Sequence, residues 1–107
     1  MKLPQSSDLF GVLAALESPD ECRSFLAEVL SPDELRDVMT RWEIFLLLAQ
    51  GLTYQEIKAR INTSNETISR GSRTLTPESF SRRIIETYRH PTLYSYVLCW
   101  ATVTRQA

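Results

Sequence analysis

The sequence of 107 residues predicts an all-α protein of about six helices. Three observations predict this class: apolar residues recur at helical spacing along most of the chain, two segments have the form of capped helix starts, and outside residues 93–103 no stretch shows strand periodicity. We expect residues 1–107 to form one domain. Because a domain of this size buries only about two thirds of its unfolded surface, a partner subunit would stabilise it.

Capping residues define the helices of the first half of the chain. Residues 7–17 form an amphipathic opening segment, with three leucines and a valine on one face. The motif SPDE occurs at 18–21 and again at 31–34, and each copy places serine at the N-cap, proline at the first helical position and glutamate at the third. Helices are therefore expected to begin at Pro19 and Pro32. The second should end at Gln50, since Gly51 suits the residue after a helix.

The segment from Pro32 to Gln50 is apolar over much of its circumference. Apolar residues at helical spacing form a stripe along one face of this segment, and Ile44, Leu47 and Leu48 widen it. Such a helix needs contacts on two sides, either in a central core position or at a subunit interface. We expect residues 1–50 to hold the core and dimerisation helices of a homodimer.

Residues 52–75 have the spacing of a helix-turn-helix. Two short helical segments, 52–61 and 64–75, are separated by Asn62 and Thr63, and Asn62 can take the left-handed conformation of a tight turn. In this motif the second helix enters the major groove of DNA. The interior contacts are expected from Ile57, Ile61, Ile68 and Leu75, and the DNA-binding residues are expected to be Gln55, Lys58, Ser64, Asn65, Glu66, Ser69 and Arg73. Similar helix pairs occur in proteins that never meet DNA, so a helical protein-interaction module stays open.

Residues 76–107 are expected to form C-terminal helices. A weaker helix start, TPES, lies at 76–79, and the helix that follows should end before Pro91. Residues 93–103 fit a helix or a strand, and they are well short of the ~20 residues that span a bilayer. Cys22 and Cys99 lie far apart, and no apolar run of signal-peptide type begins the chain, which favours reduced thiols in the cytoplasm.

Charge is segregated along the chain. Residues 1–52 carry four bases and nine acids, whereas residues 53–90 carry seven bases and four acids, so a polyanion would bind the second half. His90 is the only histidine, and neither a glycine-rich phosphate loop nor metal-ligand spacing occurs. We therefore expect neither an enzyme nor a metal site.

Residues 30–75, LSPDELRDVMTRWEIFLLLAQGLTYQEIKARINTSNETISRGSRTL, resemble the core of the Trp repressor family. In that family an L-T-P-D-E helix start is followed by a T-R pair and, after the turn, by T-I-T-R-G-S-N-S-L. The preceding SPDECRSFLAEVLS resembles the YerC-type branch of the same superfamily. The resemblance implies a transcriptional repressor, an intertwined homodimer that binds a double-stranded DNA operator with L-tryptophan as co-repressor.

The resemblance also implies a ligand site. In the family the indole of tryptophan lies between two arginines beside a small glycine, and the matching residues are Arg41, Arg70 and Gly71. Ser31 and Thr74 match positions that hydrogen-bond the amino acid. Other roles stay open: Arg41 can pair with a nearby acid, Arg70 can contact phosphate, and Gly71 can allow close helix packing. A regulator without a ligand is therefore an alternative.

The chain departs from the family pattern in its helix-turn-helix. Glu66 replaces a small residue, Arg73 replaces asparagine, residues 62–64 replace a glycine-rich turn, and the loop after Gly51 is one residue shorter. The operator sequence of the family therefore does not transfer to this chain.

Overall fold

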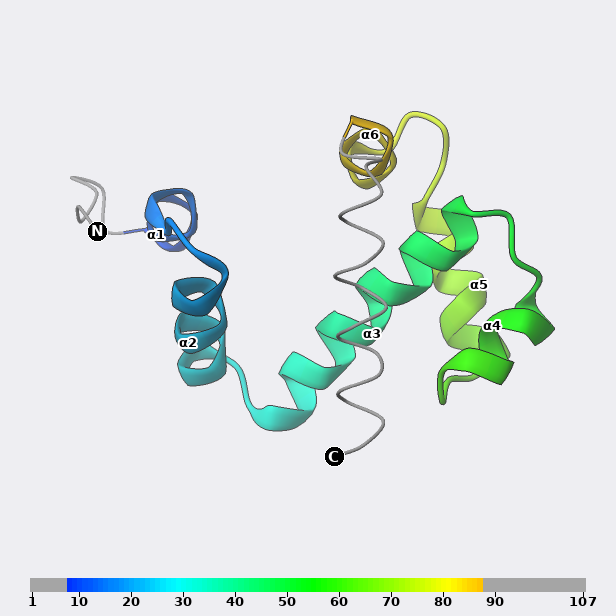
Figure 1. Ribbon diagram of the computed structural model, residues 1–107, viewed down its shortest axis with the longest axis horizontal. Coiled ribbons are helices and arrows are strands. Elements are labelled where there is room, and N and C mark those ends of the chain that lie inside the picture. The colour runs from blue at the N-terminus through cyan, green and yellow to red at the C-terminus, as the bar shows by residue number, and fades with distance from the viewer. Residues whose placement is uncertain (1–7, 88–107) are drawn as a thin grey trace. The chain divides into compact units, whose positions relative to one another are not determined.

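The computed structural model describes residues 8–87, which form six α-helices and no strand (Figure 1). The helices are α1 (Leu9–Ala15), α2 (Pro19–Val29), α3 (Pro32–Ala49), α4 (Tyr54–Arg60), α5 (Asn65–Thr74) and α6 (Phe80–Thr87). The predicted all-α class is confirmed for this part of the chain. The segment 93–103 and the predicted helix end at residues 88–90 lie outside the described residues.

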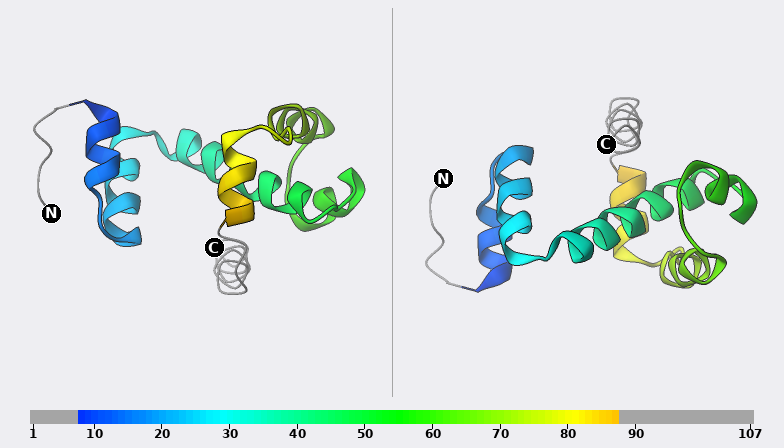
Figure 2. Two further views of the ribbon diagram at one scale, coloured as in Figure 1. Left: turned by 90° about the horizontal axis from the view of Figure 1, so that it is seen from above. Right: turned by 90° about the horizontal axis from the view of Figure 1, so that it is seen from below.

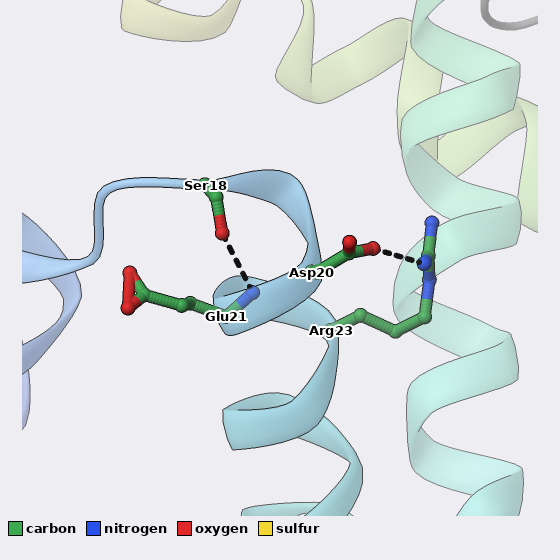
Figure 3. Close-up of polar contacts among 4 residues, drawn as sticks. All are labelled: Ser18, Asp20, Glu21 and Arg23. Atoms are coloured by element: carbon green, nitrogen blue, oxygen red, sulfur yellow. Dashed lines mark hydrogen bonds and ion pairs between the residues drawn. The ribbon is translucent and has the colours of Figure 1, made fainter.

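The two SPDE motifs cap helices as predicted. At α2 the Ser18 hydroxyl accepts a hydrogen bond from the Glu21 N–H at 3.1 Å, and Arg23 forms an ion pair with Asp20 at 3.1 Å (Figure 3). At α3 the Ser31 hydroxyl accepts from the Glu34 N–H, while the carboxylate of that glutamate accepts from the Ser31 N–H at 2.9 Å. These bonds satisfy amide groups that have no partner within the helix, which fixes where the chain enters it.

The backbone contacts divide the chain into two units, Met1–Val38 and Met39–Ala107, and α3 contributes residues to both. In the first unit, no residue of α1 or α2 is buried. Large apolar side chains are exposed there, and Phe10 shows 77% of its surface; the others are Leu9, Leu13, Val29 and Val38. Within this unit, as far as the structure describes it, these apolar side chains are not covered by the neighbouring helices.

In the second unit, α4 and α5 pack against the C-terminal half of α3 (Figure 1). Ile44 and Leu47 of α3 form a cluster with Ile57 of α4 and Ile68 of α5, and all four are buried. Ile61 packs at the edge of the cluster. The interior contacts predicted for the helix pair are thus confirmed, and they hold both α4 and α5 against α3.

A second apolar cluster packs α6 against α3. Leu46 of α3, Leu75 at the end of α5 and Ile85 of α6 are buried together, and α6 crosses α3 (Figure 2). Arg82 of α6 donates hydrogen bonds from Nε and Nη2 to the Leu75 carbonyl at 3.3 and 3.1 Å. The C-terminal end of α5 is therefore fixed by both packing and hydrogen bonds.

Two local predictions are wrong. Gly51 has φ 85°, as expected after a helix, but no described non-glycine residue has a positive φ, so Asn62 is not left-handed. The connection from α4 to α5 instead runs through extended backbone at Ile61 and Ser64. The TPES motif does not start a helix, because the Ser79 hydroxyl accepts from the Arg82 N–H at 3.1 Å and α6 begins at Phe80.

Among residues 8–87, no helix has both the length and the apolar character that a membrane crossing requires.

Candidate nucleic-acid interface

Caps at both helix starts position the α4–α5 pair. The Thr53 hydroxyl accepts from the Glu56 N–H, and the Glu56 carboxylate accepts from the Thr53 N–H at 3.1 Å, which completes a capping box on α4. The Ser64 hydroxyl accepts from the Thr67 N–H at 3.2 Å and caps α5. The capping box on α4 was missed in the sequence, although the pattern T-x-x-E predicts it.

One face of α5 carries polar side chains along its length. Glu66, Ser69, Arg70 and Arg73 are spaced at i, i+3, i+4 and i+7, so they share one stripe, which we call the α5 stripe. Ser69 is half-buried and the other three are exposed. The opposite face of α5 carries the buried Ile68 and packs against α3. Packing against α3 therefore fixes α5 with its polar side chains facing away from the core, where a partner can contact them.

The other residues predicted to bind DNA are also accessible. Gln55 and Lys58 are exposed on α4, and Ser64 and Asn65 are exposed at the start of α5. This exposure is what contact with a large partner requires.

The charges of the pair are mostly positive. Arg70 and Arg73 lie on α5, Lys58 and Arg60 lie on α4, and all four are exposed. Glu66 is the only acid in α5, and its Oε1 lies 3.8 Å from Nη2 of Arg70. Arg60 was not among the predicted contacts, although its place in the last turn of a basic helix indicates one.

Hydrogen bonds lower the pKa of the glutamate that caps α4. The Thr53 N–H makes the largest contribution to the low pKa of Glu56, followed by the Thr53 hydroxyl and then by the charge of Arg60. At neutral pH this carboxylate is ionised, so the cap on α4 is intact.

The residues expected around a ligand lie in different surroundings. Arg41 and Thr74 are exposed in the second unit, and Ser31 is exposed in the first. Arg70 lies on the α5 stripe beside Glu66, where the sequence prediction had not placed it. Its spacing of four residues from Glu66 is the signal that identifies this position.

Gly71 is buried where α5 approaches α3. A Cβ atom at this position would lie 3.0 Å from Cγ2 of Ile44, 3.4 Å from Cδ1 of Leu48 and 3.6 Å from Cδ1 of Phe45. The missing side chain therefore lets the two helices come close together. This geometry fits the close-packing role left open for this glycine.

Among residues 8–87, no group of three or more His, Cys, Asp or Glu side chains is placed to hold a metal ion. Cys22 of α2 is a free, half-buried thiol.

Residues 5–84 match the family model described as Trp repressor protein. The uncharacterized protein YerC of Bacillus subtilis (strain 168) is 31% identical to the chain over 67 residues. That match covers 63% of this chain and 64% of YerC, which is less than two thirds of the relative's own length. No solved structure matches the chain.

Proposed function

The chain belongs to the Trp repressor family, and we propose that it is a helix-turn-helix transcription regulator that binds double-stranded DNA through α4 and α5. The observation that carries this proposal is the α5 stripe, a row of four polar side chains, three of them exposed, on a helix whose other face packs against α3. In a helix-turn-helix the second helix lies in the major groove and the first crosses the backbone. The cytoplasmic location expected from the sequence fits this role.

The side chains of the pair suggest different roles in DNA binding. Arg73 has the fork that reads guanine through O6 and N7, and Asn65 has the amide that reads adenine. Ser69 can hydrogen-bond a base edge. Lys58 and Gln55 of α4 suit contacts to phosphate, which position the protein without reading sequence.

We propose that the regulator is a homodimer assembled through its first unit. The support is the absence of any buried residue from α1 and α2, together with the exposed Phe10 and Leu9. A second copy would cover these apolar faces and remove them from water. The two α5 helices of such a dimer would meet half-sites about 34 Å apart on one face of DNA.

Light scattering after gel filtration tests the dimer. A particle with twice the mass of the chain at micromolar concentration is expected, and Phe10→Glu should shift it toward the monomer because it would bury a charge. A wild type that remains a monomer would contradict the proposed assembly.

We also propose L-tryptophan as a co-repressor, because the resemblance to the Trp repressor family implies it; Arg41, Arg70 and Gly71 would then lie around the indole and Thr74 near its polar groups. Exposed guanidinium groups can stack on an indole and bind a carboxylate. The close contact of Gly71 with Ile44 favours the second candidate, a regulator that needs no ligand.

A thermal melt with and without millimolar L-tryptophan distinguishes the two candidates. Ligand at about a hundred times its Kd stabilises the folded state by about 2.7 kcal/mol, which raises the Tm by several degrees in a domain of this size. Arg70→Leu is the matched variant, because it removes an exposed guanidinium that would stack on the indole without changing the core, and it should not respond. An unchanged wild-type Tm in a protein that still binds DNA would leave the ligand-independent regulator.

Fluorescence anisotropy with the full chain and labelled duplexes tests DNA binding itself. Lys58→Ala should weaken binding to every sequence alike and reduce the salt dependence by about one counterion. Arg73→Ala should cost about 1–3 kcal/mol on a selected site and much less on random DNA. The matched control is Arg36→Ala, which removes an equal charge from the exposed Arg36–Asp33 pair of the first unit. It should change neither the affinity for the selected site nor the affinity for random DNA.

A wild type that binds no duplex even at low salt would contradict the proposal. The helical protein-interaction module would then be the better account.

A further inference from the structure

The α5 stripe contains a carboxylate at a position where DNA would repel it. Glu66 lies in the first turn of α5, with Arg73 seven residues further along the same face. Its side chain is 78% exposed, so burial does not explain the residue. Every other charged residue of α5 is an arginine.

Two ordinary roles account for part of this arrangement. An acid in the first turn interacts favourably with the helix dipole, by about 0.3–1 kcal/mol at an exposed site. The ion pair with Arg70 is exposed and separated by 3.8 Å, so it adds little to stability. Neither role requires the carboxylate to lie on the outward stripe or to have the length of glutamate.

The base edges of the major groove provide a reason for both properties. The N4 amino group of cytosine is a donor that glutamate accepts well, whereas adenine presents a donor next to the N7 acceptor, which suits an amide better. A carboxylate in the N-terminal half of the second helix lies where side chains of a helix-turn-helix contact base edges. Arg70, four residues on, offsets the negative charge that phosphates would otherwise repel.

We propose that Glu66 is a specificity-determining residue that accepts a hydrogen bond from the N4 amino group of a cytosine in each half-site. Arg70, whose Nη2 lies 3.8 Å from the carboxylate, compensates its charge. This inference rests on the DNA-binding function proposed above.

Selection of duplexes from a randomised pool by binding to the 107-residue chain, followed by sequencing, tests the inference. The wild type is expected to prefer cytosine at one position of each half-site, by roughly 5-fold to 100-fold over other bases. Glu66→Gln keeps the length but replaces the carboxylate by an amide, so the preference at that position should change from cytosine to adenine. Its affinity for random duplex should rise, because a negative charge has been removed from the interface.

Glu66→Asp separates base reading from the helix dipole. Aspartate keeps a negative charge in the first turn but is one methylene shorter, so the Tm should stay the same while the cytosine preference falls at least fivefold. The control is Glu86→Gln, which removes an equal charge from an exposed site on α6 and should leave base preference unchanged.

The outcomes distinguish this inference from the proposed function. If the wild type selects a sequence and Glu66→Gln selects the same one, the cytosine contact is wrong while DNA binding stands. A lower Tm in Glu66→Gln with unchanged base preference would show that Glu66 acts only through the helix dipole. That result would also overturn the inference. If the wild type binds no duplex, the proposed function itself fails.

Discussion

Replacing Gly71 by alanine tests the close approach of α5 to α3. In an open helix the change from glycine to alanine stabilises by about 1 kcal/mol, because alanine loses less backbone freedom on folding. Here the new methyl group would lie 3.0 Å from Cγ2 of Ile44, well inside ordinary contact. Ile44 is only 1% exposed and belongs to the cluster that holds α4 and α5, so it has little room to move.

The magnitude follows from these opposing effects. Overpacking of a close-packed core costs about 1–3 kcal/mol. Set against the gain of about 1 kcal/mol from helix propensity, Gly71→Ala should lower the free energy of unfolding by about 0–2 kcal/mol. Ser72→Ala, at an exposed neighbouring position, has the propensity gain without the contact and should stabilise slightly, by up to about 0.5 kcal/mol.

Urea denaturation followed by circular dichroism measures these differences. A double-mutant cycle with Ile44→Leu makes the test specific, because leucine lacks the Cγ2 branch that the new methyl group would meet. Gly71→Ala should then cost less in the Ile44→Leu background, with a coupling energy of about 1 kcal/mol. If Gly71→Ala instead stabilises by about 1 kcal/mol without coupling to Ile44, the space beside the glycine is open.

Three further predictions concern the hydrogen bonds from α6 to the end of α5 and the caps of α4 and α5. Arg82→Met keeps the aliphatic stem but removes both hydrogen bonds to the Leu75 carbonyl, so it should lower the free energy of unfolding by about 1.5–3 kcal/mol in urea; a cost no larger than that of Arg83→Met would contradict this. Ser64→Ala should cost about 0.5–2 kcal/mol through loss of the α5 cap, whereas Ser64→Asp should retain most of the stability, and equal losses in both would argue against the cap. Because the folded-state pKa of Glu56 lies below its ordinary value of 4.5, its contribution to stability is present above that pH and is lost as the pH falls through the lowered pKa. Glu56→Gln should therefore show a smaller fall in Tm from pH 6 to pH 3 than the wild type, and identical pH profiles would remove this role.

The sequence predicted the elements that depend on local interactions. Ser18 and Ser31 cap helices because each is followed by proline and, three residues on, by glutamate. TPES lacks that glutamate, and Ser79 provides the cap instead, three residues later than expected. The spacing of Ile57 and Ile68 predicted their burial because helical periodicity reports directly on which face is covered.

The contacts made between helices could not be predicted in the same way. Nothing in the spacing of α5 shows that Ile44 of α3 meets the space beside Gly71, because that contact depends on how two helices cross. The pairing of Arg70 with Glu66 follows from their four-residue spacing, whereas the family resemblance implies a ligand contact for Arg70. The two hydrogen bonds from Arg82 to the Leu75 carbonyl depend on the path of residues 76–79. The capping pattern predicted a helix start in that segment, whereas α6 begins at Phe80.

Hydrogen–deuterium exchange of the full chain, with and without a duplex that it binds, tests the central claim most directly. If α4 and α5 form the DNA-binding surface, peptides that cover residues 52–75 should exchange more slowly in the complex, while those of residues 9–29 should be unchanged by DNA. Slower exchange confined to other segments, with residues 52–75 unaffected in a complex that has formed, would contradict the account.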